Sequence, residues 1–208
     1  MGFGISSIIL EPKDMFNTLS GMEQLTKDIV AKLADITQVL QQSSTITFAV
    51  GFADLIKQAE GQINQVGSAT VASNNALNSA CKDVVNQLVE KFSPEGAKSD
   101  YGSPPWIEIS IKVNTPDRAQ IYPPQIQSNM DQNQQTNNQL ATRSNDMREI
   151  FSSTKNFWVG ESADKTRSSF ESRVVPQFED MLSVLGKIVE LGFSWVEDAV
   201  KFEASLGV

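Results

Sequence analysis

Two pairs of adjacent carboxylates are the residues whose types could support chemistry. Glu179-Asp180 and Glu197-Asp198 could bind a metal ion, or act as a general acid and a general base. Both pairs fall on the polar side of a segment with helical periodicity, and adjacent residues on a helix do not face each other. We therefore interpret these four residues as a solvated surface.

The residues that would normally accompany such carboxylates are missing. The chain has no histidine, the commonest general base and metal ligand. The single cysteine, Cys81, cannot form an internal disulfide and falls on an apolar helical stripe, so we expect a small buried residue rather than a reactive thiol. No nucleophile has a plausible activating partner, and no glycine-rich phosphate-binding loop is present. The sequence predicts a protein that is not an enzyme and uses no cofactor or metal.

Net charge and hydropathy exclude some classes of binding partner. The 208 residues carry a net charge of −8, which repels nucleic-acid phosphates and anionic lipid headgroups. No apolar run is long enough to span a bilayer, and the first ten residues lack the features of a secretory signal peptide. We expect no nucleic-acid partner and no stable membrane insertion.

Four segments carry apolar residues at helical spacing. The first follows Pro12 with a heptad pattern of about 28 residues, and the second runs from about Phe52 to Phe92. The third begins at Tyr122-Pro123-Pro124; it is rich in Gln and Asn, and its surviving periodicity favours a polar-faced helix over disorder. The fourth follows Gly160 and carries the strongest stripe, with a kink or break expected at Pro176.

Between the second and third segments lies a stretch of another character. Residues 93–105 are rich in proline and glycine, which predicts a linker. Residues 106–113 alternate apolar and polar, as in a strand. Because no second convincing strand is present, we expect these residues to lie as an extended arm along the helices.

One pattern occurs twice. Phe48-Ala49-Val50-Gly51 and Phe157-Trp158-Val159-Gly160 each separate two helical segments, and Asp54 or Asp164 follows in the first turn of the next helix. Glycine permits a positive φ at such a turn. We expect each to be the elbow of a hairpin, with a turn motif of Phe48, Gly51, Phe157, Trp158 and Gly160.

The predicted fold is therefore all-α, with two long helical hairpins packed as an elongated four-helix bundle. Residues 1–93 would form the first hairpin, residues 94–108 the linker and residues 109–208 the second hairpin.

The second half, from Ile109 to Leu206, resembles the WXG family of small helical-hairpin proteins exported by type VII secretion systems. The resemblance rests on Trp158-Val159-Gly160 at the turn between two amphipathic arms. The stretch from Phe170 to Pro176 is similar to the related LXG domains, which target toxins to the same machinery. The first half looks like a degenerate sister unit with Ala49 in place of the tryptophan.

The resemblance implies a non-catalytic type VII secretion-associated protein: an exported substrate, a carrier or a partner adaptor for a toxin. It implies another helical secretion-system protein or a toxin as partner, with a homo-dimer as a further pairing. It also implies a chain that is secreted without an N-terminal signal peptide, or cytoplasmic before export. The family's export signal, Tyr-x-x-x-Asp/Glu, is not matched, since Phe193 and Glu197 have its spacing without the tyrosine, so a partner would have to supply it.

The last helical segment supplies the candidate partner-binding face. Its residues are Phe170, Phe178, Met181, Leu185, Ile188, Trp195 and Phe202. Two alternative functions remain open. Aromatic residues on this amphipathic segment are also typical of a membrane-active helical toxin, and the heptads would equally suit a structural coiled-coil interaction module.

Overall fold

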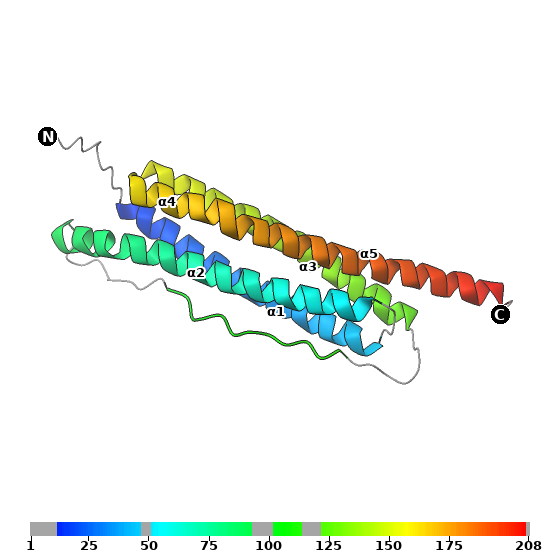
Figure 1. Cartoon of the computed structure of the whole chain (residues 1–208). Coiled ribbons are helices and arrows are strands. Elements are labelled where there is room, and N and C mark those ends of the chain that lie inside the picture. Colours follow the sequence, from blue (N-terminus) through cyan, green and yellow to red (C-terminus); the bar gives the residue numbers. More distant parts are fainter. Residues whose placement is uncertain (1–11, 47–50, 93–101, 114–121, 207–208) are drawn as a thin grey trace. The chain divides into compact units, whose positions relative to one another are not determined.

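The computed structural model describes residues 12–46, 51–92, 102–113 and 122–206, and over these residues the fold is all-α, as predicted (Figure 1). No β-strand occurs in these ranges. The α-helices are α1 (Pro12–Ile46), α2 (Phe52–Phe92), α3 (Pro123–Ser153), α4 (Glu161–Ser169) and α5 (Val175–Ser205). A 3-10 turn, η1 (Thr154–Asn156), follows α3, and a π-helical turn, η2 (Phe170–Val174), joins α4 to α5.

The helix bounds agree with the sequence pattern except at the end of α1. The α2 helix has the predicted bounds, and the Gln- and Asn-rich segment is helical, as predicted. The α1 helix has 35 residues rather than the predicted length of about 28, because it continues through the polar, β-branched stretch after Leu40. The hydroxyls of Ser43, Ser44 and Thr45 donate to carbonyl oxygens three or four residues back, which satisfies them within the helix.

The chain divides into two compact units, and each unit draws on both halves of the sequence. Unit 1 comprises residues 1–29, 68–106 and 143–176, and unit 2 comprises residues 30–67, 107–142 and 177–208. In these terms the α3–α4 elbow belongs to unit 1, and the turn into α2 belongs to unit 2. The predicted division was into two consecutive stretches, residues 1–93 and 109–208, each forming one hairpin. That division into hairpins stays a prediction.

Unit 1 contains aromatic and ionic contacts between its helices around a buried apolar core. The rings of Phe151 in α3 and Phe170 in η2 stack in parallel, with centroids 4.0 Å apart. The guanidinium of Arg143 in α3 bonds to Asp28 in α1 at 2.5 Å and to Asp146 at 2.9 Å. Buried apolar side chains of this unit are Met15, Leu19, Met22, Ile29, Leu77 and Met147.

Unit 2 has a core of close helix–helix contacts. Phe52 in α2 packs edge-on against Trp195 in α5, with ring centroids 5.2 Å apart. Gly192 in α5 lies so close to the Met130 side chain of α3 that no Cβ could be added there without a clash. Buried apolar side chains of this unit are Leu33, Ile36, Leu40, Ile56, Ile63 and Phe178.

Where a kink or break was expected near Pro176, the structure has a π-helical turn immediately before the proline. The N–H of Val175 bonds to the carbonyl of Phe170, five residues back, so the turn is wider than an α-helical turn. Pro176 has no N–H, and its ring would clash with a carbonyl one turn back in a regular helix. The π-helical turn thus accommodates the proline without ending the helix.

The predicted arm is extended and lies against the helices. Residues 102–113 have no regular secondary structure. In unit 1, the Asn75 side chain accepts from the Ser103 N–H at 2.8 Å and donates to the Ser103 carbonyl at 3.4 Å. In unit 2, side chains of α1 and α2 hold residues 109–112 in the same way. Part of the predicted linker is therefore an ordered, bound segment, while residues 94–101 lie outside the described ranges.

Candidate functional site: the α3–α4 elbow

The elbow between α3 and α4 is built from the predicted turn motif. Phe157 and Trp158 are buried, and the Trp158 N–H bonds to the Thr154 carbonyl at 2.8 Å, which closes the chain after α3. Gly160 has φ 135° and ψ 171°, a conformation open essentially only to glycine. Its carbonyl accepts the first helical bond of α4, from the Asp164 N–H at 3.0 Å. The predicted need for glycine here is confirmed.

The turn before α2 shares two features with this elbow, a glycine with positive φ and the first helical bond accepted by its carbonyl. Gly51 has φ 86°, and its carbonyl accepts a bond from the Leu55 N–H at 3.1 Å. Asp54 lies in the first turn of α2, as Asp164 does in α4. Phe48, the other predicted residue of this turn, lies outside the described residues. Both helices that follow an elbow therefore begin at a glycine with positive φ.

Arg167 is the residue of the site that sequence reasoning missed. Its side chain is buried, with 8% of the residue exposed, and it belongs to α4. One terminal nitrogen donates to Thr154 Oγ1 and to the Trp158 carbonyl oxygen, each at 3.0 Å, and the other donates to Asp164 at 2.6 Å. The signal that would have found it is the Asp164–Arg167 spacing, which places an ion pair one helical turn after the motif.

Through these contacts, Arg167 connects residues on both sides of the elbow. Its guanidinium lies 5.9 Å from the Trp158 ring centroid, within range of a cation–π interaction. Every polar partner is either a main-chain carbonyl of the turn, a hydroxyl of η1 or a carboxylate of α4. A single buried charge therefore joins the end of α3 to the start of α4.

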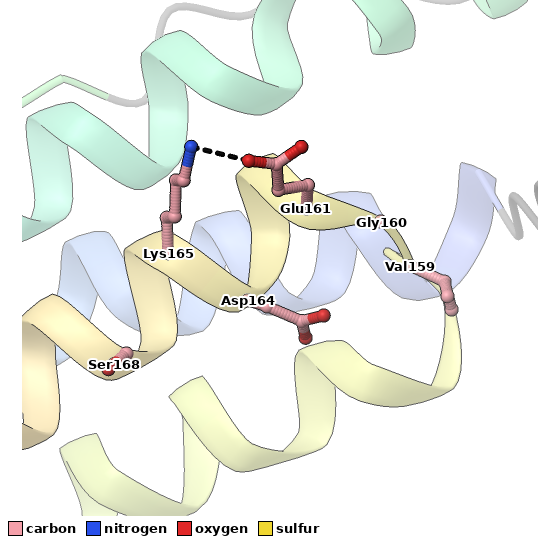
Figure 2. A pocket seen from close by; sticks show the side chains of 6 residues that line it. All are labelled: Val159, Gly160, Glu161, Asp164, Lys165 and Ser168. Atoms are coloured by element: carbon pink, nitrogen blue, oxygen red, sulfur yellow. Dashed lines mark ion pairs between the residues drawn. The ribbon is translucent and has the colours of Figure 1, made fainter.

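An open hollow lies at the elbow and the first two turns of α4 (Figure 2). Its lining residues are Val159, Gly160, Glu161, Asp164, Lys165 and Ser168. Glu161 and Lys165 form an ion pair at 2.6 Å, and Figure 2 shows Asp164 pointing away from that pair. Both carboxylates of the hollow are thus paired with cations, Lys165 and Arg167. The hollow presents a mixed-charge surface with no unpaired general base beside Ser168.

The paired carboxylates and the cysteine have the exposure that the helical periodicity predicted. Glu179, Asp180, Glu197 and Asp198 are exposed on α5. Cys81 is buried, as predicted, and burial raises the pKa of its thiol to about 11, which keeps it neutral. Within the described ranges no three His, Cys, Asp or Glu residues gather as metal ligands would.

The predicted partner-binding face is divided by the structure. Phe170, Phe178, Met181, Leu185 and Ile188 are buried by the chain's own helices, so they form core rather than an open surface. Trp195 is half-buried against Phe52. Phe202 is exposed, with 66% of its surface open to solvent. Its large apolar neighbours Val200 (56%) and Leu206 (61%) are exposed as well. Only the end of the stripe is open, because sequence periodicity does not distinguish a face covered within the chain from one covered by a partner.

Across the described residues, no helix has the length and apolar character needed to cross a membrane. No protein-family model, curated protein or solved structure matches the chain.

Proposed function

We propose that this chain acts by protein–protein contact, as a non-catalytic substrate, carrier or partner adaptor of a type VII secretion system. The observation that carries the proposal is the form of the Trp158-Val159-Gly160 elbow. Its tryptophan is buried, its glycine has φ 135° and it lies between two helical segments, and this arrangement supports the resemblance of the Trp-Val-Gly motif to a WXG-type turn.

The open end of α5 supports a helical partner. Phe202 and Leu206 continue the spacing of three and four residues that the buried part of the α5 stripe follows, and they are exposed. Such a stripe is completed by the apolar face of another helix. The neighbouring charged residues of α5 are Glu197, Asp198, Lys201 and Glu203, with a net charge of −2. The partner helix should therefore carry basic residues beside its own stripe.

Capture of the partner tests the proposal. The tagged chain is co-expressed with each helical protein encoded beside it, and captured proteins are compared with those of the double variant Phe202→Ser, Leu206→Ser. We expect capture by the parent chain and its loss in the double variant. Glu190→Ser, at an exposed position of the same helix, is the matched control and should capture normally. Equal capture by the parent and the double variant, or no capture of any co-encoded helical protein, would contradict the proposal.

Export supplies a second readout. The chain should reach the culture medium of its host, and disruption of the secretion ATPase should abolish this. Leakage of anionic liposomes that depends on Phe202 would instead favour the membrane-active alternative.

A further inference from the structure

The arm in unit 2 is held almost entirely by its main chain. The Asn64 side-chain amide accepts from the Ile109 N–H at 2.9 Å and donates to the Ile109 carbonyl at 3.0 Å. The Gln41 amide makes the same pair of bonds with Lys112, both at 2.8 Å. Each amide thus satisfies both main-chain groups of one arm residue, which is what a neighbouring β-strand would do.

Charged side chains complete this recognition at Ile111. Its N–H donates to Glu60, and its carbonyl accepts from the Lys57 ammonium at 2.7 Å. Lys57 and Glu60 also pair with each other at 2.9 Å, so each charge keeps a partner. Hydrogen bonds to charged groups are stronger than neutral ones. The peptide groups of Ile111 are therefore the central fixing point of the arm.

Most side chains of the arm are exposed. Ile111 is fully buried and Ile109 and Val113 are half-buried, whereas Ile107 is 82% exposed and Glu108, Ser110 and Lys112 are exposed. The helices thus contact an extended main chain, the whole side chain of Ile111 and part of two further apolar side chains. An extended segment with apolar residues at these positions meets the same requirements.

We propose that the side chains of Gln41, Lys57, Glu60 and Asn64 form a binding site for extended polypeptide, which residues 107–113 occupy as an intramolecular ligand. We call this set the backbone-binding face. Its ligand in trans is an extended segment of a partner protein with a β-branched aliphatic residue in the place of Ile111. This binding mode adds a strand-like peptide through main-chain bonds and one pocket. It does not depend on the secretion role proposed above.

A peptide-binding experiment with the full chain tests the proposal. The probe is a fluorescent peptide with the sequence of residues 106–113, followed by anisotropy. The parent chain should bind it weakly, because its own arm fills the face. The variant Ile111→Asp loses the anchor of its arm and should bind the probe at least about tenfold more tightly.

Altered probe peptides distinguish recognition of the main chain from nonspecific binding. A probe N-methylated at Ile109 lacks the donor that Asn64 accepts from, and it should lose binding. A probe with Ile111→Asp should also fail, and one with Glu108→Ala and Ser110→Ala should bind as well as the parent probe. Removing Asn64 and Gln41 from the protein, as Asn64→Leu and Gln41→Leu in the Ile111→Asp background, should abolish binding.

The proposal has clear failing outcomes. A second variant, Ile109→Pro, displaces the arm by removing a different main-chain donor, and it decides the matter if Ile111→Asp does not fold. Retention of helical circular dichroism without improved binding in the folded variant would overturn the proposal, as would equal binding of the N-methylated probe. Unfolding of both variants would overturn it as well, because an arm that the fold requires is not displaceable.

Discussion

The Arg167 guanidinium lies 5.9 Å from the Trp158 ring centroid, and it donates to the Trp158 carbonyl oxygen at 3.0 Å. One α4 side chain therefore holds both the ring and the main chain of the turn residue nine positions earlier. The tryptophan does not fix the elbow alone, since it contacts a buried charge that has two further partners, Thr154 and Asp164.

Replacing Arg167 with methionine should weaken the fold of unit 1 substantially. The change removes the donors to Thr154 Oγ1 and to the Trp158 carbonyl, and a buried acceptor left unsatisfied costs about 1–3 kcal/mol. We expect a loss of about 2–3 kcal/mol in the free energy of unfolding, measured by urea denaturation. Asp164 is 73% exposed at its side chain, so losing its arginine adds little.

Arg143→Met is the matched control. Arg143 also bonds to two carboxylates, Asp28 and Asp146, but its side chain is 41% exposed. An exposed ion pair contributes less than about 1 kcal/mol, so this variant should unfold close to the parent. Similar losses for the two arginines would show that burial of Arg167 does not set its contribution.

Gly160→Ala should destabilise the elbow through the backbone alone. No atom lies within 4 Å of the position a Cβ would take, so the cost comes from φ 135°, which an L-residue rarely adopts. We expect a loss of about 1–3 kcal/mol, measured by thermal or urea unfolding. Gly61→Ala, within α2 and equally free of contacts, should have the opposite sign, with a gain of about 0.5–1 kcal/mol. A stabilising Gly160→Ala would contradict the assigned turn geometry.

The elements that the sequence predicted well are those set by local rules. The bounds of α2, the glycine turns and the irregular turn before Pro176 each follow from backbone chemistry within a few residues. The end of α1 was missed because Ser43 and Ser44 satisfy their hydroxyls inside the helix. Propensity alone counts such residues against a helix.

The parts that the sequence could not predict depend on contacts between distant residues. Phe178 and Phe202 lie on the same apolar stripe of α5. Phe178 is buried and Phe202 is exposed because other helices cover only the first of them. The role of Arg167 requires Trp158 and Thr154 to be brought within reach by the turn. The arm was expected to lie on helices, but the amides that hold it are 45 and 71 residues away in sequence.

Gly192→Ala should destabilise unit 2 by a different mechanism. A Cβ at this position would overlap the Cγ and Sδ atoms of Met130, whose side chain is fully buried. Overpacking of this kind costs about 1–3 kcal/mol, measured as a lower urea midpoint. Gly186→Ala, in the same helix with no atom within 4 Å, should be neutral or stabilising.

A double-mutant cycle checks the origin of that cost. Met130→Ala alone should destabilise by about 2–5 kcal/mol, because it leaves a cavity. In the Met130→Ala background, Gly192→Ala should cost nothing, since the clashing atoms are gone. Additive effects of the two substitutions would show that Gly192 is not in contact with Met130.

Acid should release the arm at Ile111. Burial acts to raise the pKa of the Glu60 carboxyl, but the bond from the Ile111 N–H and the nearby Lys57 ammonium outweigh it, so the pKa lies below its ordinary value of 4.5. A lowered pKa means that the folded state favours the ionised carboxylate. Its contribution to stability is complete above pH 4.5 and is lost as the pH falls through the lowered pKa.

The amide resonances of the arm provide the measurement and its internal control. The Ile111 N–H donates to the titrating Glu60, whereas the Ile109 N–H donates to Asn64, which does not titrate. Below pH 4.5 the Ile111 amide should shift and lose exchange protection before the Ile109 amide does. Glu60→Gln should remove the acid transition at Ile111. Of the two amides, only that of Ile111 is bonded to the carboxylate. If both amides changed together, and did so equally in the Glu60→Gln variant, acid would be acting on the whole unit rather than on Glu60.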